Sequence, residues 1–400
     1  MTEHATAPVN DHGDPWSAVR GQPAAVAALQ AALRRDEVAH AWLLVGPSGL
    51  DQPMLARAFA AALNCPDAPS PDRGCGACST CDRILRGAHP VVTDLEPEGA
   101  NHVVAHVRED WIPTATRSLT EGRRQVLRIV AADRMNEAAQ NAFLKVLEEP
   151  PPSVVWLLDV QEEGALLDTI ASRCRRLDLV PWGPRELEAE AAALGIPDEQ
   201  QVVLARASLG LPQRLRDLAD EDVALARERH LDVVDRLATG GPGVVVSLAK
   251  ELTTWAKGRA AVVKEKHAEE LAQYEEDFGI DERGRGWPAG MKKRITDRHQ
   301  RLERREQRRA LDLMLDDLAS YLRDVLAVGS GASADQLVNL DAEVAVRRDV
   351  ERLPPAAAVE GLAAIEACRH ALDRNGAPEL QIERLLLTLA LPIYANQRAA

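Results

Sequence analysis

The chain has 400 residues, a formal net charge of −14 at pH 7 and only 3% aromatic residues. Its length predicts two or three domains, and its acidic charge argues against a protein that coats DNA through a general positive charge. No apolar run of about 18 residues could cross a bilayer, and nothing near the N-terminus resembles a signal peptide. We therefore expect a soluble, cytoplasmic protein without membrane contacts.

The first half of the sequence predicts an α/β domain. Residues 1–15 are polar and are expected to form a disordered tail. Unbroken apolar runs at residues 41–45, 126–131 and 154–158 are typical of strands that are buried on both faces. Helical spacing separates these runs, and consecutive prolines end the helix over 136–149. Strands that alternate with helices in this way indicate a parallel sheet.

A glycine-containing turn follows the first strand and can be compared with the phosphate-binding pattern G-x-x-x-x-G-K-[ST]. Gly46 falls on the first glycine of the pattern, and Gly49 lies within the turn. The last three positions are Asp51, Gln52 and Pro53, so that the lysine and the hydroxyl are both missing. The carboxylate of Asp51 would repel a bound triphosphate. Pro53 offers neither a hydroxyl to bind Mg²⁺ nor a backbone N–H to bind phosphate. On this segment alone, a chance Gly-Pro turn explains the pattern equally well.

Four cysteines form the most specific local pattern, Cys65-x9-Cys75-x2-Cys78-x2-Cys81. Four thiolates at such spacing can complete a tetrahedral Zn²⁺ site, which leaves no open coordination position and is therefore structural. An iron–sulfur cluster and a set of free buried cysteines are the alternatives. Cys174 and Cys368 lie apart from this group, and we expect both to be ordinary buried residues.

The sequence from residue 126 to residue 151 closely resembles the second nucleotide-site motif of bacterial DNA polymerase III clamp-loader subunits, which are AAA+ proteins. Active members of that family end the strand with Asp-Glu-Ala-Asp, whereas this chain has Val130-Ala131-Ala132-Asp133. The resemblance implies that Val130 replaces the Mg²⁺-organising aspartate and Ala131 the water-activating glutamate. Two separate motifs have therefore lost ATP chemistry, and we expect no bound nucleotide and no ATP hydrolysis.

The segment Ser172-Arg173-Cys174 resembles the family's Ser-Arg-Cys motif. In the family, this arginine enters the ATP site of the next subunit, so the resemblance implies that Arg173 is an arginine finger acting in trans. A surface arginine is the common alternative, and solvated or interface charges are expected at Arg175 and Arg176.

Shorter resemblances support the same family. Gly21-Gln22 resembles the box beside the adenine pocket, and Arg214 lies where the second sensor arginine is found. Asp159 replaces the small polar residue that is usual on the strand after Pro152.

Beyond the α/β domain, the sequence predicts helices. The resemblance implies an AAA+ domain at 16–182 that contains the zinc module 65–81, a helical lid at 183–240 and an all-α collar for oligomerisation at 241–400. Within the collar, residues 257–309 are heavily charged. We favour a solvated hairpin of two long helices over a nucleic-acid contact there, because no aromatic residues suited to base stacking interleave the arginines.

Retention of Ser-Arg-Cys, loss of both ATP motifs and the four cysteines together resemble the delta-prime class of the family. The resemblance implies a non-hydrolysing stator in a ring with gamma/tau and delta subunits, which loads the β sliding clamp onto primed DNA. Such a chain would be part of a DNA-directed DNA polymerase holoenzyme. It would count as a nucleotidyltransferase only through membership of that complex. Two alternatives stay open: an ATP-hydrolysing gamma/tau-type motor with a divergent loop, and a free-standing nucleic-acid-binding zinc protein.

Overall fold

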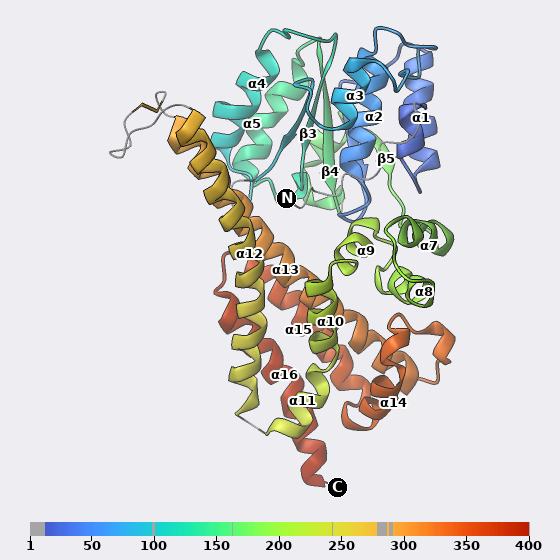
Figure 1. Cartoon of the computed structure of the whole chain (residues 1–400), viewed down its shortest axis with the longest axis vertical. Coiled ribbons are helices and arrows are strands. Elements are labelled where there is room, and N and C mark those ends of the chain that lie inside the picture. The colour runs from blue at the N-terminus through green and yellow to red at the C-terminus, as the bar shows by residue number, and fades with distance from the viewer. Residues whose placement is uncertain are drawn as a thin grey trace. The chain divides into compact units, whose positions relative to one another are not determined.

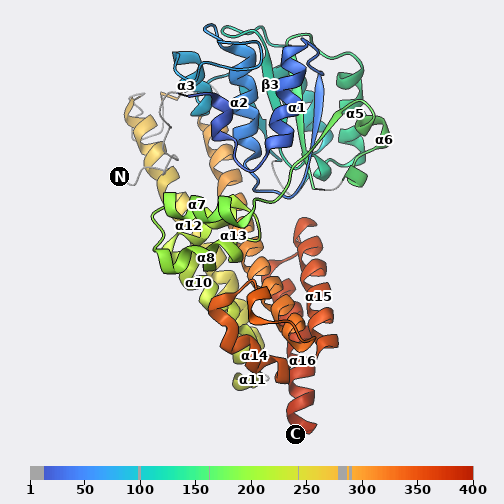
Figure 2. The same ribbon diagram turned by 90° about the vertical axis from the view of Figure 1, so that its right-hand side faces the viewer.

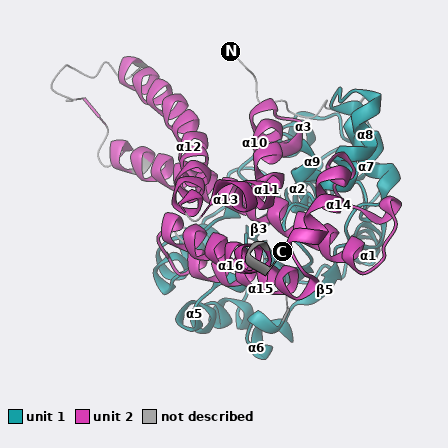
Figure 3. Cartoon of the chain, turned by 90° about the horizontal axis from the view of Figure 1, so that it is seen from below, with its two compact units in different colours: residues 1–216 teal, residues 217–400 magenta. Residues whose placement is uncertain are grey.

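The computed structural model describes residues 13–97, 101–161, 163–241, 243–277, 286–287 and 291–399. Residues 1–12 of the predicted tail therefore lie outside the described residues. Arg283 and Arg285 of the charged segment also lie outside them. The chain forms two compact units, Met1–Arg216 and Asp217–Ala400 (Figure 3).

A five-stranded parallel sheet forms the centre of the first unit (Figure 1). Its strands are β1 (Ala41–Val45), β2 (Val92–Leu95), β3 (Gln125–Ile129), β4 (Val154–Val160) and β5 (Arg175–Asp178), in the order β2-β3-β4-β1-β5. The three predicted strands are the three central ones, and the predicted parallel sheet is confirmed. The strand expected over 126–131 ends earlier, at Ile129, because Ala131 adopts a left-handed backbone with φ 51°.

Helices cover both faces of this sheet. The first face packs against α1 (Pro23–Arg34), α2 (Gln52–Asn64) and α3 (Ser79–Leu85), and Figure 2 shows α1 and α2 in front of the strands. The opposite face packs against α4 (Ile112–Thr116) and α5 (Glu137–Glu148), through Trp111, Phe143 and Trp156. After α6 (Asp168–Ala171) and β5, the chain forms α7 (Pro184–Ala193), α8 (Asp198–Ala207) and α9 (Pro212–Leu218).

The second unit is helical in all its described elements. It contains α10 (Glu221–Leu231), α11 (Val233–Gly240), α12 (Val244–Asp277), α13 (Met291–Gly329), α14 (Glu343–Arg352), α15 (Pro355–Asp373) and α16 (Pro378–Ala399). The long helices share one apolar core, which includes Leu248, Met314, Tyr321, Ile365 and Leu389. Among the described helices, none is long and apolar enough to span a bilayer. The predicted lid and collar boundaries stay predictions.

Candidate functional site

The loop between β1 and α2 has the course of a phosphate-binding loop. Gly46 fits only as glycine, since an added Cβ would lie 2.6 Å from the carbonyl oxygen of Leu179. Asp51 takes a left-handed backbone (φ 61°) immediately before α2, at a position where the pattern has glycine. The N-terminus of α9 lies on this loop, because the Gln213 amide donates a 3.3 Å hydrogen bond to the Gly49 carbonyl.

Gln52 fills the loop from inside. Its side chain is buried, its Nε2 donates to the Pro47 carbonyl at 2.9 Å, and its Oε1 accepts from the Leu50 N–H at 3.1 Å. Loops of this kind bind phosphate through free backbone N–H groups at a helix N-terminus. Here the Leu50 N–H donates to the neutral side-chain amide of Gln52, within the loop itself.

Asp51 forms a two-point ion pair with Arg216 of α9. The distances are 2.6 Å from Nη1 to Oδ1 and 3.0 Å from Nη2 to Oδ2, and Arg216 also contacts Glu190 at 2.8 Å. Burial lowers the pKa of Arg216, but the two carboxylates outweigh burial and raise it above its ordinary value. Two acidic side chains therefore converge beside the loop and are neutralised within the chain.

Arg214, which the resemblance aligns with the second sensor arginine, also lies on α9, and that assignment stays a prediction. Arg214 is buried, and its Nε donates to the Ala207 carbonyl at 2.8 Å. The signal that could have identified Arg216 is helical spacing: Gln213 and Arg216 are three positions apart and share one face of α9.

At the second motif, the structure shows neutral groups at the positions of the missing carboxylates. The backbone N–H of Val130 donates to Leu95 at 3.0 Å, and its carbonyl lies 2.7 Å from Nε2 of the buried His102. Ala131 offers only a methyl group. Asp133 is half-buried in the turn after the strand.

The side chain of Asp159 pairs with an arginine of the neighbouring strand. Arg128 on β3 donates two 2.8 Å hydrogen bonds to Asp94 on β2 and one of 2.9 Å to Asp159 on β4. Burial raises the pKa of Asp159 to about 6, against the opposing effect of Arg128. Asp159 therefore has a structural role, because its ion pair with Arg128 joins two adjacent strands. The sequence pattern did not reveal this pair.

The four predicted cysteines come together in space. Their Sγ atoms all lie within 4.8 Å of one another, a spacing that could hold a metal ion. Cys65 follows α2, Cys75 lies in the connecting loop, and Cys78 and Cys81 begin α3. A tetrahedral Zn–S distance of about 2.3 Å implies sulfur–sulfur separations of roughly 3.8 Å, and Cys65 and Cys78 are 3.9 Å apart.

Backbone N–H groups within the cluster point at sulfur atoms. Cys75 donates to Cys65 Sγ at 3.3 Å, and Cys78 donates to Cys75 Sγ at 3.3 Å. Burial raises the pKa of the Cys75 thiol, but the N–H groups of Cys78 and Ala77 outweigh it and lower that pKa to about 7. At Cys75 these donors favour the thiolate, which is the form that binds metal, whereas burial raises the pKa of Cys65 and Cys81.

Arg173 lies on the surface of the first unit, just after α6. Its side chain is 38% exposed; Nη1 donates to the Thr169 carbonyl at 2.9 Å, and Nη2 contacts Glu148 at 3.0 Å. An exposed pair of this kind contributes less than about 1 kcal/mol, so a neighbouring anion can displace Glu148.

The residues beside Arg173 are surface charges and a half-buried thiol. Arg175 lies over the ring of Trp42 at 5.2 Å, and Arg176 pairs with Asp178 at 2.8 Å. Cys174 is half-buried, so the expectation that it is buried was wrong, whereas Cys368 is buried as expected.

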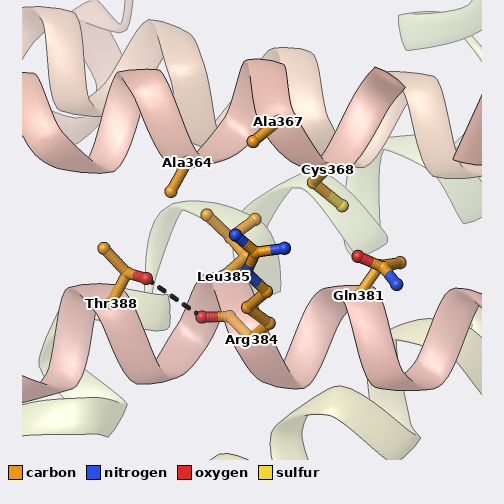
Figure 4. A pocket seen from close by; sticks show the side chains of 7 residues that line it. All are labelled: Ala364, Ala367, Cys368, Gln381, Arg384, Leu385 and Thr388. Atoms are coloured by element: carbon orange, nitrogen blue, oxygen red, sulfur yellow. Dashed lines mark hydrogen bonds between the residues drawn. The ribbon is translucent and has the colours of Figure 1, made fainter. Parts of the chain in front are cut away.

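A small pocket between α15 and α16 is lined by Ala364, Ala367, Cys368, Leu385 and the side chain of Arg384 (Figure 4). Thr388 does not face it with a free hydroxyl, since its Oγ1 donates to the Arg384 carbonyl at 3.1 Å. Gln381 also lines it, but we assign no ligand to this small pocket, because one cation and one amide give too few convergent polar groups.

Comparisons with known proteins show which families this sequence is similar to. Residues 21–182 match the family described as "DNA polymerase III, delta subunit". The chain is 36% identical over 207 residues to DNA polymerase III subunit delta' of Pseudomonas aeruginosa, covering 50% of this chain and 61% of that protein. It is 26% identical over 219 residues to the delta' subunit of Bacillus subtilis, covering 54% and 65%.

A gamma/tau subunit also matches, from Mycobacterium tuberculosis, at 27% identity over 222 residues, which cover 54% of this chain and 38% of that protein. The chain thus spans less than two thirds of the length of each of these three relatives. The chain is thus similar to a DNA polymerase III delta-subunit family over residues 21–182, and over about half its length to delta' subunits of bacterial DNA polymerase III.

Proposed function

We propose that the protein is a delta-prime-like clamp-loader subunit that does not hydrolyse ATP. In this proposal, it occupies a ring with gamma/tau and delta subunits in the cytoplasm, and the ring loads the β sliding clamp onto primed DNA. The observation that carries the proposal is the loop itself: Gln52 fills it, and Asp51 is held by Arg216. At the positions that the resemblance assigns to Mg²⁺ and to water activation, the chain has Pro53, Val130 and Ala131, none of which carries a side-chain ligand or base.

The proposal gives Arg173 the role of an arginine finger for a neighbouring subunit's ATP. Its support is the exposed guanidinium, which contacts a backbone carbonyl and a surface carboxylate, together with its place in the Ser-Arg-Cys segment. A planar cation that neutralises charge on a γ-phosphate can accelerate hydrolysis roughly 10³–10⁵-fold at the site it serves. The same proposal includes a lid at residues 183–240 and a collar at residues 241–400. It also includes a structural Zn²⁺ bound by the four cysteines.

The test is Arg173→Ala in a complex reconstituted with gamma/tau and delta subunits, with Arg176→Ala as the matched control. Arg176 is also exposed and also pairs with a surface carboxylate. We expect R173A to assemble normally by gel filtration and to lower DNA-stimulated ATP turnover several-fold, while R176A behaves as the unmodified protein. Unchanged turnover in R173A would refute the finger.

The alternative, a motor subunit with a divergent loop, is tested on the isolated chain. A fluorescent ATP analogue is titrated with Mg²⁺ present. Saturation in the micromolar range would favour the motor. We expect no saturation below about 1 mM, because the Leu50 N–H and the loop carboxylate are already engaged within the protein.

A further inference from the structure

The charged segment of the second unit forms a two-helix arm, defined here as residues 257–277 of α12 and 291–309 of α13. The two helices run side by side, and Figure 3 shows them extending from the rest of their unit. On these helices, the apolar core of the unit ends at Ala256 and Ala310. Beyond that level, the arm buries Ile295 and two histidines, so apolar packing contributes little to its stability.

Ion pairs across the seam join the two helices instead. Lys292 contacts Glu275 at 3.0 Å, Arg259 contacts Glu306 at 3.5 Å, and His267 contacts Glu303 at 3.2 Å. The rings of His267 and His299 stack at 4.0 Å, and His299 contacts Glu270 at 3.0 Å. The carboxylates at the seam are therefore engaged inside the arm.

The charges of the arm are unequally divided between the helices. Residues 291–309 contain nine basic residues (Lys and Arg) and three acidic ones (Asp and Glu). Residues 257–277 contain four basic and six acidic residues. Two of the three acids in residues 291–309, Glu303 and Glu306, face α12. The outward face of α13 is therefore basic, with Asp297 as its acidic residue.

Helical spacing aligns Lys293, Arg301, Arg304 and Arg308 on that face. From residue 293 to residue 308, this row extends about 22 Å. Arg308 is occupied by Asp312 and Asp373, and Arg301 also has a contact within the chain. Lys293 and Arg304 are exposed, and within the described parts of the chain no carboxylate forms an ion pair with either.

We propose that this basic face of α13, which the proposed function does not use, binds the phosphate backbone of duplex DNA independently of sequence. A straight row of about 22 Å spans about six base-pair steps, and lysine and arginine are the groups that neutralise phosphates. The face has no aromatic residue on which bases could stack. It also has no apolar side chains to insert into a lipid surface.

The test measures binding of the full chain to a fluorescently labelled 30-base-pair duplex by anisotropy, between about 20 and 200 mM KCl. The variant is K293E/R304E. The matched control is K257E/K264E, which reverses the same number of exposed charges on the other helix of the arm. Circular dichroism checks that both variants keep their helices, and K293Q/R304Q repeats the test without adding negative charge.

We expect salt-sensitive binding by the unmodified chain, weakened at least tenfold in K293E/R304E and less than threefold in K257E/K264E. The slope of log K against log salt should shrink by about 1.8, since each phosphate contact contributes about 0.9. Equal weakening by both variants, or no binding at 20 mM salt, would overturn the proposal. Displacement of the duplex by equimolar polyglutamate would also overturn it, in favour of an acidic protein partner.

Discussion

Asp51 and Arg216 lie 165 positions apart in the sequence and meet through two hydrogen bonds beside the loop between β1 and α2. The carboxylate stands at the N-terminus of α2, where a bound anion would otherwise be stabilised by the helix dipole. The guanidinium comes from α9, whose first turn also contacts Gly49. The chain thus supplies both the anion and the cation beside this loop.

The first prediction concerns the strength of this pair. Asp51→Ala leaves the largely buried Arg216 with Glu190 alone, and we expect a loss of about 1–3 kcal/mol in the free energy of unfolding. The measurement is urea unfolding followed by tryptophan fluorescence, for D51A, R216A and the double variant. The coupling energy of the cycle should be about 1 kcal/mol or more.

Arg20→Ala is the matched control for that cycle. Arg20 contacts the same Glu190 at 2.8 Å, but its side chain is 41% exposed. Its removal should cost less than about 1 kcal/mol, because solvent screens exposed pairs. Additive effects of D51A and R216A would show that the pair does not stabilise the loop.

The second prediction concerns metal. We expect one zinc ion per chain in protein purified without chelator, and its loss in Cys78→Ser, because three thiolates cannot complete the site. Metal binding of this kind contributes on the order of 10 kcal/mol to local folding. Protease cleavage within residues 65–81 should therefore accompany the loss.

Cys174→Ser is the control, since Cys174 is a half-buried free cysteine outside the cluster. It should retain the full metal content in elemental analysis. Purified protein that contains iron, or no metal at all, would contradict the zinc assignment.

The sequence was sufficient to predict the centre of the sheet and the cysteine cluster, because both depend on local patterns. Buried central strands are unbroken apolar runs, and a metal site requires ligands at short spacing. The edge strands β2 and β5 were missed. The sequence of β5, Arg175–Asp178, has one buried residue, Leu177, so its strand conformation depends on pairing with β1 rather than on its own composition.

The contacts beside the loop between β1 and α2 could not be derived in the same way. Arg216 and Asp51 belong to distant parts of the chain, and only the packing of α9 brings them together. The same holds for Arg128, which appears in the sequence as one polar residue within an apolar strand. Its partners Asp94 and Asp159 lie on neighbouring strands, so that only the strand order and register identify them.

The last prediction concerns pH and His102. This fully buried imidazole lies beside Trp111, and its Nε2–H donates to the carbonyl of Val130 in the degenerate second motif. Burial lowers its pKa from 6.5 to about 4, and the nearby charges of His106 and Arg134 act in the same direction. Between these two values the unfolded chain binds a proton that the folded chain does not. Stability contributed by the neutral ring is therefore present above about pH 6.5 and is lost as the pH falls towards 4, by about 3 kcal/mol in all.

The measurement compares urea unfolding of the unmodified chain and His102→Gln at pH 7.5, 6.5, 5.5 and 4.5. Acid also protonates the cysteine ligands, but it does so in both proteins, so the difference between their free energies of unfolding isolates the imidazole. We expect H102Q to be less stable at pH 7.5, because glutamine fills the buried site less well. The difference between the two proteins should then shrink by about 1 kcal/mol for each pH unit below 6.5. Parallel pH profiles would mean that His102 is not held neutral by its burial beneath the second motif.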